Sequence, residues 1–103
     1  MKFQWDETKR KANLKKHDVG FEDAALVFDD RDYVLLNDRI DEWTGEQRYN
    51  AIGSALTRSG KRAILTVTHV YREGANEEEI IRIISARKAN DRERKFYFQG
   101  TAQ

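Results

Sequence analysis

Hydrophobic and polar positions near the start of the chain predict a short strand followed by a helix. Phe3 and Trp5 alternate with polar neighbours, which is typical of a strand. Asp6 can then cap a helix. We expect this helix to run to about His17. Asp18 is its predicted C-terminal stop, because aspartate tolerates left-handed backbone geometry better than most residues.

The rest of the chain predicts a second short helix, four strands and a last helix. The second helix follows Gly20 and has apolar residues at positions 24–28. Short turn-like links separate most of the strands, which favours antiparallel neighbours. The helices are grouped apart from the strands along the chain, which indicates the α+β class. We expect one domain, residues 1–103, with N-terminal helices, a four-stranded antiparallel sheet and a C-terminal helix. The strands are expected at 33–36, 49–56, 63–71 and 79–85, with a charged loop at 37–45 and the last helix at 90–98.

Composition narrows the class of protein. Hydrophobic residues make up 39% of the 103 residues and charged residues 36%, but the apolar residues are clustered, which favours a folded domain. No apolar run approaches the roughly 20 residues needed to span a bilayer, and no signal-like segment opens the chain. There is no cysteine, P-loop, dinucleotide-binding glycine pattern or metal-type histidine spacing. We therefore expect a cytoplasmic protein with no membrane contact, cofactor or metal.

Charge is unevenly distributed along the chain, although the formal net charge is only +1. Residues 82–95 hold six basic side chains against two acidic ones, whereas residues 29–48 hold seven acidic side chains against three basic ones. This segregation permits one face for a polyanion and another for a cationic partner. A mixed, solvated surface is the alternative interpretation of the composition alone.

Arg82 stands inside the isoleucine run of the last predicted strand. Its charge requires water, an anion or a carboxylate, and a salt-bridged arginine lying along the sheet is the simplest explanation. In the predicted hairpin, His69 lies roughly across from Ile81 or Arg82, so one register places His69 beside Arg82 and the other separates them by the sheet. Side by side, an imidazole and a guanidinium suit phosphodiester cleavage. A lone strand histidine is also commonly a packed residue.

Two more cations are expected just after this strand. Arg87 and Lys88 together favour an anion-binding site at the start of the last helix, and a solvated turn is the alternative. Asn90 and Glu93 have the spacing of a capping box, in which the two side chains bond each other's backbone N–H groups. Glu93 therefore has a structural explanation beside a minor catalytic role.

Several segments resemble the BrnT family of bacterial toxins over nearly the whole chain. The matching patterns are F-x-W-D-x-x-K at 3–9, N-L-x-K-H-x-V-x-F-E-D-A at 13–24, V-F-D-D at 27–30, R-Y-x-x-I-G at 48–53, the strand at 65–69, R-I-I-S-A-R-K-A at 82–89 and R-E-R at 92–94. Three positions depart from the family pattern. Asp18 replaces a usual glycine, Gly20 a usual serine or threonine, and Arg31 a frequent proline. All three departures concern caps and turns.

The resemblance implies a fold similar to RelE-type ribonuclease toxins and a metal-independent ribonuclease that blocks translation. It also implies a BrnA-type antitoxin with a ribbon-helix-helix part that holds the toxin inactive. The complex would bind operator DNA only through the antitoxin.

We therefore expect an endoribonuclease toxin in which Arg82 and Arg87 clamp the scissile phosphate, Lys88 binds a flanking phosphate and His69 transfers protons. One alternative is a non-enzymatic module that binds RNA or a protein partner, and another is a degenerate toxin kept as a scaffold for its antitoxin. The acidic segment 29–48 is expected to form part of the antitoxin interface. The expected catalytic residues are His69, Arg82, Arg87 and Glu93, and the expected RNA-phosphate-binding residues are Lys88, Arg92 and Arg94.

Overall fold

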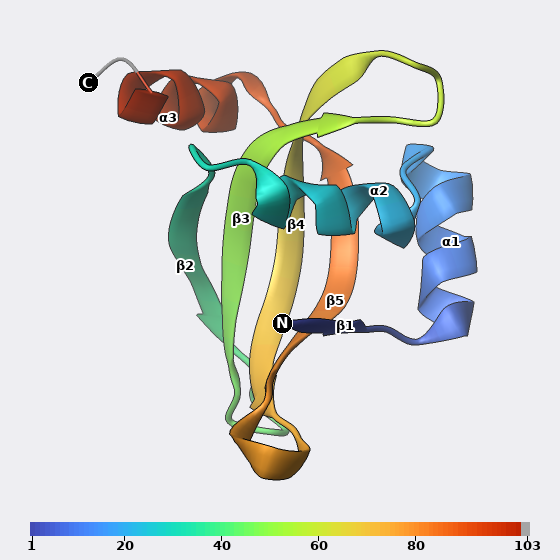
Figure 1. The fold of residues 1–103 in the computed structure, drawn as a ribbon, viewed down its shortest axis with the longest axis vertical. Coiled ribbons are helices and arrows are strands. Elements are labelled where there is room, and N and C mark those ends of the chain that lie inside the picture. Colours follow the sequence, from blue (N-terminus) through green and yellow to red (C-terminus); the bar gives the residue numbers. More distant parts are fainter. Residues whose placement is uncertain (102–103) are drawn as a thin grey trace.

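The computed structural model describes residues 1–101, which form an α+β domain built on one five-stranded sheet (Figure 1). The strand order is β1-β5-β4-β3-β2, with β1 parallel to β5 and all other neighbours antiparallel. The α+β class is confirmed, but the predicted four antiparallel strands are one too few, because β1 joins the sheet edge. The elements are β1 (Lys2–Gln4), α1 (Glu7–His17), α2 (Phe21–Ala25), the 3₁₀ helix η1 (Leu26–Asp29), β2 (Val34–Ile40), β3 (Gln47–Leu56), β4 (Arg62–Glu73), the 3₁₀ helix η2 (Ala75–Glu77), β5 (Glu79–Lys88) and α3 (Asp91–Thr101).

Both ends of α1 are where the sequence predicts them. The Asp6 carboxylate accepts a hydrogen bond from the backbone N–H of Lys9 at 3.0 Å, which satisfies one of the free donors of the first turn. Asp18 has a φ of 58°, the left-handed geometry that stops a helix, and its N–H donates to the carbonyl of Leu14.

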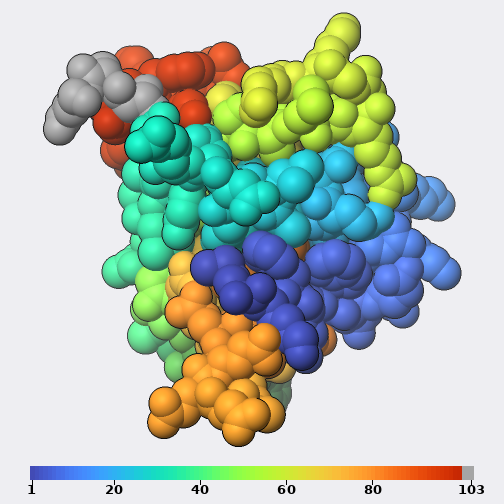
Figure 2. All heavy atoms as spheres, viewed as in Figure 1, coloured from blue at the N-terminus to red at the C-terminus, as the bar shows by residue number. Residues whose placement is uncertain are grey.

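The helices α1 and α2, with η1, cover one face of the sheet, and we call it the covered face. In Figure 1, α2 and η1 lie in front of the strands and α1 lies beside β5, and Figure 2 shows α2, η1 and the N-terminal segment over the middle of this face. Phe21 and Val27 from the helical segment pack with strand residues that include Leu65, Ile81 and Ile83, and all five are at most 1% exposed. This layer is the hydrophobic core, whose burial stabilises the fold.

Among residues 1–101, α3 covers one end of the opposite face, which we call the open face, where it contacts β3 and β2. Four residues of β4 alternate onto it, from Thr66 to Arg72. The buried members Thr66 and Val70 are 1% and 3% exposed, whereas Arg72 is exposed. Within residues 1–101, no helix is long and apolar enough to cross a membrane.

A β-bulge interrupts the side-chain alternation of β5. Thr68 pairs with Ser85 and His69 with Ile83, which leaves Ile84 without a partner on β4. Ser85 therefore does not share a face with Ile83, although a strict two-residue alternation would place them on the same face. Ser85 lies opposite Thr68 on the open face.

Two strands are longer than predicted. β2 continues to Ile40, so the predicted loop at 37–45 is shorter, and β5 continues to Lys88 rather than ending at Ser85. Arg87 and Lys88 consequently lie in the strand instead of after it, and consecutive strand residues point to opposite faces.

Asn13 of α1 supplies hydrogen bonds to β5 beyond the end of β1. Its Nδ2 donates to the carbonyls of Ala86 at 2.8 Å and Val19 at 3.0 Å, and its Oδ1 accepts from the N–H of Ala86 at 3.1 Å. The side chain thus pairs with both backbone polar groups of Ala86, as a neighbouring strand would. This contact fixes the part of β5 that holds Arg87.

Candidate functional site

The open face presents both arginines of β5. Arg82 pairs with Val70 and Arg87 with Thr66, so both lie across from open-face positions of β4. A strict two-residue alternation would place positions 82 and 87 on opposite faces. The bulge at Ile84 reverses the alternation once and brings the two guanidinium-bearing residues to the same side.

The two guanidinium groups are turned toward different elements. Arg82 Nη1 donates to Gln4 Oε1 in β1 at 2.8 Å, whereas Arg87 Nη1 and Nη2 donate to the two carboxylate oxygens of Glu93 in α3 at 2.7 and 2.9 Å. Five strand residues span up to roughly 16 Å. The structure does not bring the two guanidinium groups of the predicted clamp together, and each arginine has its own surroundings.

Glu93 links β5 to the start of α3. The predicted capping box is confirmed, because Glu93 Oε1 accepts from the N–H of Asn90 and Asn90 Oδ1 accepts from the N–H of Glu93, both at 2.9 Å. Burial raises the pKa of Glu93, but hydrogen bonds from Arg87 and Asn90 outweigh it and hold that pKa below its ordinary value. The carboxylate is ionised at neutral pH, and 40% of the Arg87 side chain stays exposed beside it.

Hydroxyl and amide groups occupy the open face between the two arginines. Thr68 and Ser85 are directly paired across β4 and β5, and both are half-buried. Thr68 Oγ1 donates to Asn50 Oδ1 on β3 at 2.7 Å. A ligand on this face would meet hydrogen-bonding groups rather than apolar side chains here.

His69 lies in the core on the covered face, so the structure does not bring it to Arg82. It is 0% exposed, and its ring makes edge contacts with Phe28 and Tyr71 at centroid distances of 4.9 and 5.0 Å. Its Nδ1–H donates to the carbonyl of Val67 at 3.0 Å. Burial lowers the pKa of His69, and the bond to Val67 opposes this only in part. The histidine is therefore a neutral, packed side chain.

Lys88 also lies apart from the arginines. It pairs with Leu65, a core residue, and so points to the covered side of the sheet. There it borders a cavity formed with Leu14 and Asp18 at the C-terminal end of α1 and with the turn between β3 and β4. The structure therefore does not bring Lys88 to the side of the sheet on which Arg87 lies.

Arg92 and Arg94 are exposed on α3, on either side of Glu93 in the sequence. The Arg92 guanidinium lies 5.7 Å from the ring centroid of Phe96, and that of Arg94 lies 5.5 Å from the ring of Phe98. Such cation–π contacts hold the planar groups against the helix surface without neutralising their charge.

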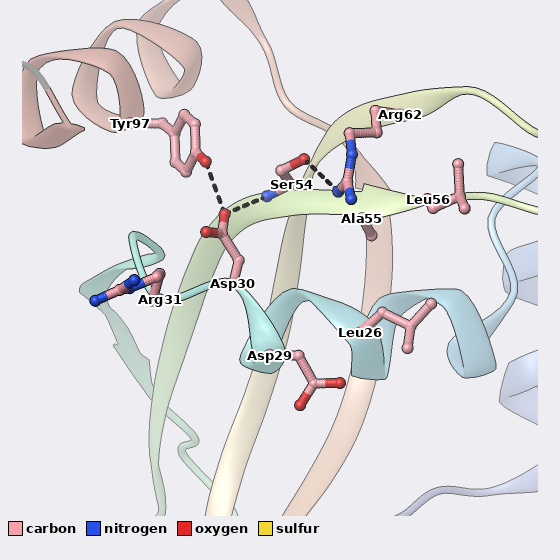
Figure 3. A pocket seen from close by; sticks show the side chains of 9 residues that line it. All are labelled: Leu26, Asp29, Asp30, Arg31, Ser54, Ala55, Leu56, Arg62 and Tyr97. Atoms are coloured by element: carbon pink, nitrogen blue, oxygen red, sulfur yellow. Dashed lines mark hydrogen bonds between the residues drawn. The ribbon is translucent and has the colours of Figure 1, made fainter.

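Asp30, at the end of η1, anchors α3 to the sheet (Figure 3). Its Oδ2 accepts from Tyr97 Oη at 2.7 Å and from Ser54 N at 2.8 Å, and its Oδ1 accepts from Asp32 N at 3.0 Å. Burial raises the pKa of Asp30, but these three hydrogen bonds together keep it below its ordinary value. Burial and the bond to Asp30 raise the pKa of Tyr97 to about 12. Tyr97 is one helical turn beyond Glu93, so this anchor also positions Glu93.

Four of the residues that shape this region are not distinguished by the sequence alone. Asn13 and Asp30 stand in the N-L and V-F-D-D patterns, but their partners lie 73 and 67 residues away, respectively. Arg48 and Arg72 border Arg82 on the open face. Arg72 lies two residues after Val70, and that spacing alone indicates a shared face.

Metal-ligating side chains do not gather within residues 1–101. No group of three or more histidine, aspartate or glutamate side chains there is arranged to hold a metal ion. The side chains that the open face presents are arginine, carboxylate, hydroxyl and amide groups.

Comparison with known protein families gives one match. A family model described as the ribonuclease toxin BrnT of type II toxin–antitoxin systems matches residues 5–93. The matched segment includes Asn13, both arginines of β5 and Glu93. No curated protein matches the chain.

Proposed function

The chain belongs to the BrnT family of ribonuclease toxins of type II toxin–antitoxin systems, and from this we propose that it is an endoribonuclease that cleaves RNA on the open face of its sheet. The proposal rests most on the Arg87–Glu93 pair. A half-exposed guanidinium and an ionised carboxylate meet there at the junction of β5 and α3, on the face that α1 and α2 leave free. Cleavage of cytoplasmic messenger or ribosomal RNA would block translation.

The proposed reaction uses the RNA's own 2′-hydroxyl as nucleophile. Glu93 accepts the 2′-hydroxyl proton while that oxygen attacks the adjacent phosphorus, and the bond from phosphorus to the 5′ oxygen breaks. Arg87 stabilises the additional negative charge on the phosphate oxygens. The departing 5′ oxygen takes a proton from water, and the hydroxide that forms takes the proton from Glu93. The products are a 2′,3′-cyclic phosphate and a 5′-hydroxyl. This sequence requires no metal.

We place proton transfer on Glu93 rather than on His69. Glu93 keeps 13% of its side chain exposed at the edge of the open face, whereas His69 is enclosed on the other side of the sheet. The hydrogen bonds from Arg87 keep Glu93 ionised, so the base is present in its active form at neutral pH. Both groups start paired, and the entering phosphate draws the guanidinium toward itself.

The remaining cations on this side would hold the rest of the strand. Arg82 lies on the same face as Arg87, five residues earlier in β5, and Arg92 and Arg94 extend positive charge along α3. Phosphate contacts of this kind are independent of base sequence and weaken with salt.

We propose further that a BrnA-type antitoxin with a ribbon-helix-helix part neutralises the toxin and alone contacts operator DNA. The acidic segment 29–48 supports a docking surface for it, because this segment includes the edge strand β2 and the turn that follows. Trp43 is 96% exposed and Ile40 61% exposed there. An extended antitoxin segment with apolar and basic side chains would pair with this edge.

The test compares purified variants and their effect on growth. Arg87→Ala and Glu93→Gln should each abolish growth arrest and lower RNA cleavage by at least about 100-fold. Arg58→Ala is the matched control, since Arg58 also pairs with a glutamate, Glu22, but lies in the β3–β4 turn. Cleavage should continue in EDTA and produce cyclic phosphate ends.

Two results would contradict the proposal. If the Arg87→Ala protein cleaves RNA as fast as wild type, Arg87 takes no part in the reaction. Salt-sensitive RNA binding by the wild type with no cleavage product would instead identify a non-enzymatic binding module.

A further inference from the structure

Arg82 borders a cavity of about 250 Å³ on the open face, separate from the Arg87–Glu93 pair. Its wall comes from α1, β3, β4, β5 and the turn between β2 and β3, and no described residue of α3 contributes. Six ionisable side chains surround it: Lys9, Asp41, Glu46, Arg48, Arg72 and Arg82.

Two of the arginines in this wall are neutralised by the carboxylates. Arg48 Nη2 donates to Asp41 at 2.9 Å, and both side chains are about one-fifth exposed. Arg72 donates to both oxygens of Glu46, at 3.0 and 3.2 Å. These fixed pairs form the rigid part of the wall, because each arginine fork is held in one orientation.

The other two cations have no such partner. Arg82 donates only to the neutral amide oxygen of Gln4, and within residues 1–101 no carboxylate forms an ion pair with Arg82 or Lys9. The cavity therefore has two uncompensated positive charges. A half-buried guanidinium without a counter-ion is costly, and an anion in the cavity would relieve that cost.

We propose that this cavity binds a second phosphate group of the RNA strand that is cut at Arg87 and Glu93, an inference that rests on the proposed ribonuclease function. Its volume is several times the ~30 Å³ that a water molecule occupies in the liquid, so a phosphate with part of its sugar fits. Lys9 and Arg82 provide the positive charge that favours binding of a phosphate over binding of an uncharged nucleobase.

The position of the cavity sets which phosphate it takes. The backbones at Arg82 and Arg87 are separated by up to roughly 16 Å of strand. The side chains also turn away from each other, Arg82 toward Gln4 in β1 and Arg87 toward Glu93 in α3. We therefore infer that the phosphate bound by Arg82 and Lys9 is not the immediate neighbour of the scissile phosphate, and that a dinucleotide does not reach both sites.

The experiment measures binding of an RNA oligonucleotide methylated at every 2′ oxygen, which cannot be cleaved, as a function of salt concentration. Lys9→Gln should weaken binding roughly fourfold at physiological salt and reduce the slope of log K against log salt by about 0.7, the value for one lost single-strand phosphate contact. The control Lys11→Gln, on the same helix but outside the cavity wall, should leave both quantities unchanged.

A second variant should act in the opposite direction. Glu46→Gln frees the Arg72 guanidinium from its carboxylate, so it should tighten RNA binding and steepen the salt slope by a similar amount. An uncleavable dinucleotide should bind wild type and Lys9→Gln equally, because it does not extend to the cavity.

The outcomes separate this inference from the proposed function. Wild-type protein that neither binds nor cleaves RNA would overturn both. If wild type cleaves RNA, but Lys9→Gln and Glu46→Gln keep its RNA affinity and salt slope, only the second phosphate site is overturned. A change in antitoxin affinity without any change in RNA affinity would also overturn it, and would assign the cavity to the protein partner.

Discussion

Arg82 and Arg87 lie on the same face of β5 although they are five positions apart, because Ile84 bulges out of the β4–β5 ladder. Without the bulge, a side chain at position 87 would enter the core beneath α1 and α2. With it, Arg87 reaches Glu93 and Arg82 reaches the cavity beside β1. The bulge thus arranges two cationic sites along one strand.

The two arginines should have different kinetic roles. Arg87→Lys should lower kcat by about 100-fold, because a point charge cannot replace the fork that stabilises the reacting phosphate. Arg82→Ala should raise KM about tenfold, with kcat within about twofold, because it removes a distant binding contact. Steady-state cleavage of a labelled oligonucleotide measures both parameters. Equal losses of kcat in the two variants would show that the arginines act on one phosphate after all.

Asn13 should contribute strongly to stability although it is far from the reacting groups. Asn13→Ala leaves both backbone groups of Ala86 without their partner in a buried place, and we expect the free energy of unfolding to fall by about 2–4 kcal/mol. Asn37→Ala, an exposed change on β2, should cost less than about 0.5 kcal/mol. Urea unfolding followed by circular dichroism compares them, and similar losses would contradict the role of Asn13.

Local interactions account for what the sequence predicts correctly. Asp6 and Asp18 define α1 through hydrogen bonds within four residues, and the capping box of Asn90 and Glu93 spans three residues. The four longer strands were recognisable from β-branched residues, with errors at their ends. Short-range chemistry of this kind is readable from one sequence.

Long-range geometry accounts for what the sequence does not predict. Residues 2–4 read as a strand, but nothing in three residues specifies parallel pairing with β5. Ile84 is an ordinary strand residue, so no glycine marks the bulge that moves Ser85 and Arg87 to the open face and Lys88 to the covered one. Whether His69 lies beside Arg82 depends on the same register of β4 against β5. The two-residue periodicity of each strand does not determine that register.

His69 should make folding stability depend on pH without affecting the cleavage step. Burial lowers its pKa in the folded protein, whereas the unfolded chain has the ordinary value near 6.5. Above that pH both states are neutral. As the pH falls below it, the unfolded state binds the proton first, so stability decreases by up to about 1.4 kcal/mol per pH unit until the folded-state pKa is reached.

The measurement is urea unfolding of wild type and His69→Gln between pH 7.5 and 5, with His17→Gln as the control histidine. The loss on acidification should be smaller in His69→Gln, and the control should behave like wild type. The pH profile of cleavage should be the same in all three proteins, since the proposed proton acceptor is Glu93. Matching unfolding curves for wild type and His69→Gln at every pH would show that His69 does not titrate as proposed.

Trp43 should be a main contact for the antitoxin. A tryptophan that is 96% exposed at the end of an edge strand has no role in the core, and aromatic residues at interface centres often contribute most of the binding energy. Trp43→Ala should weaken antitoxin binding by about 30-fold or more, while RNA cleavage by the free toxin stays unchanged. Leu56→Ala is the matched control, because Leu56 is also an exposed apolar residue, 51% exposed, but lies on β3 outside the acidic segment. When the antitoxin is co-expressed, growth arrest should persist only with the Trp43 variant. An antitoxin that binds and neutralises this variant as tightly as wild type would place its interface elsewhere on the molecule.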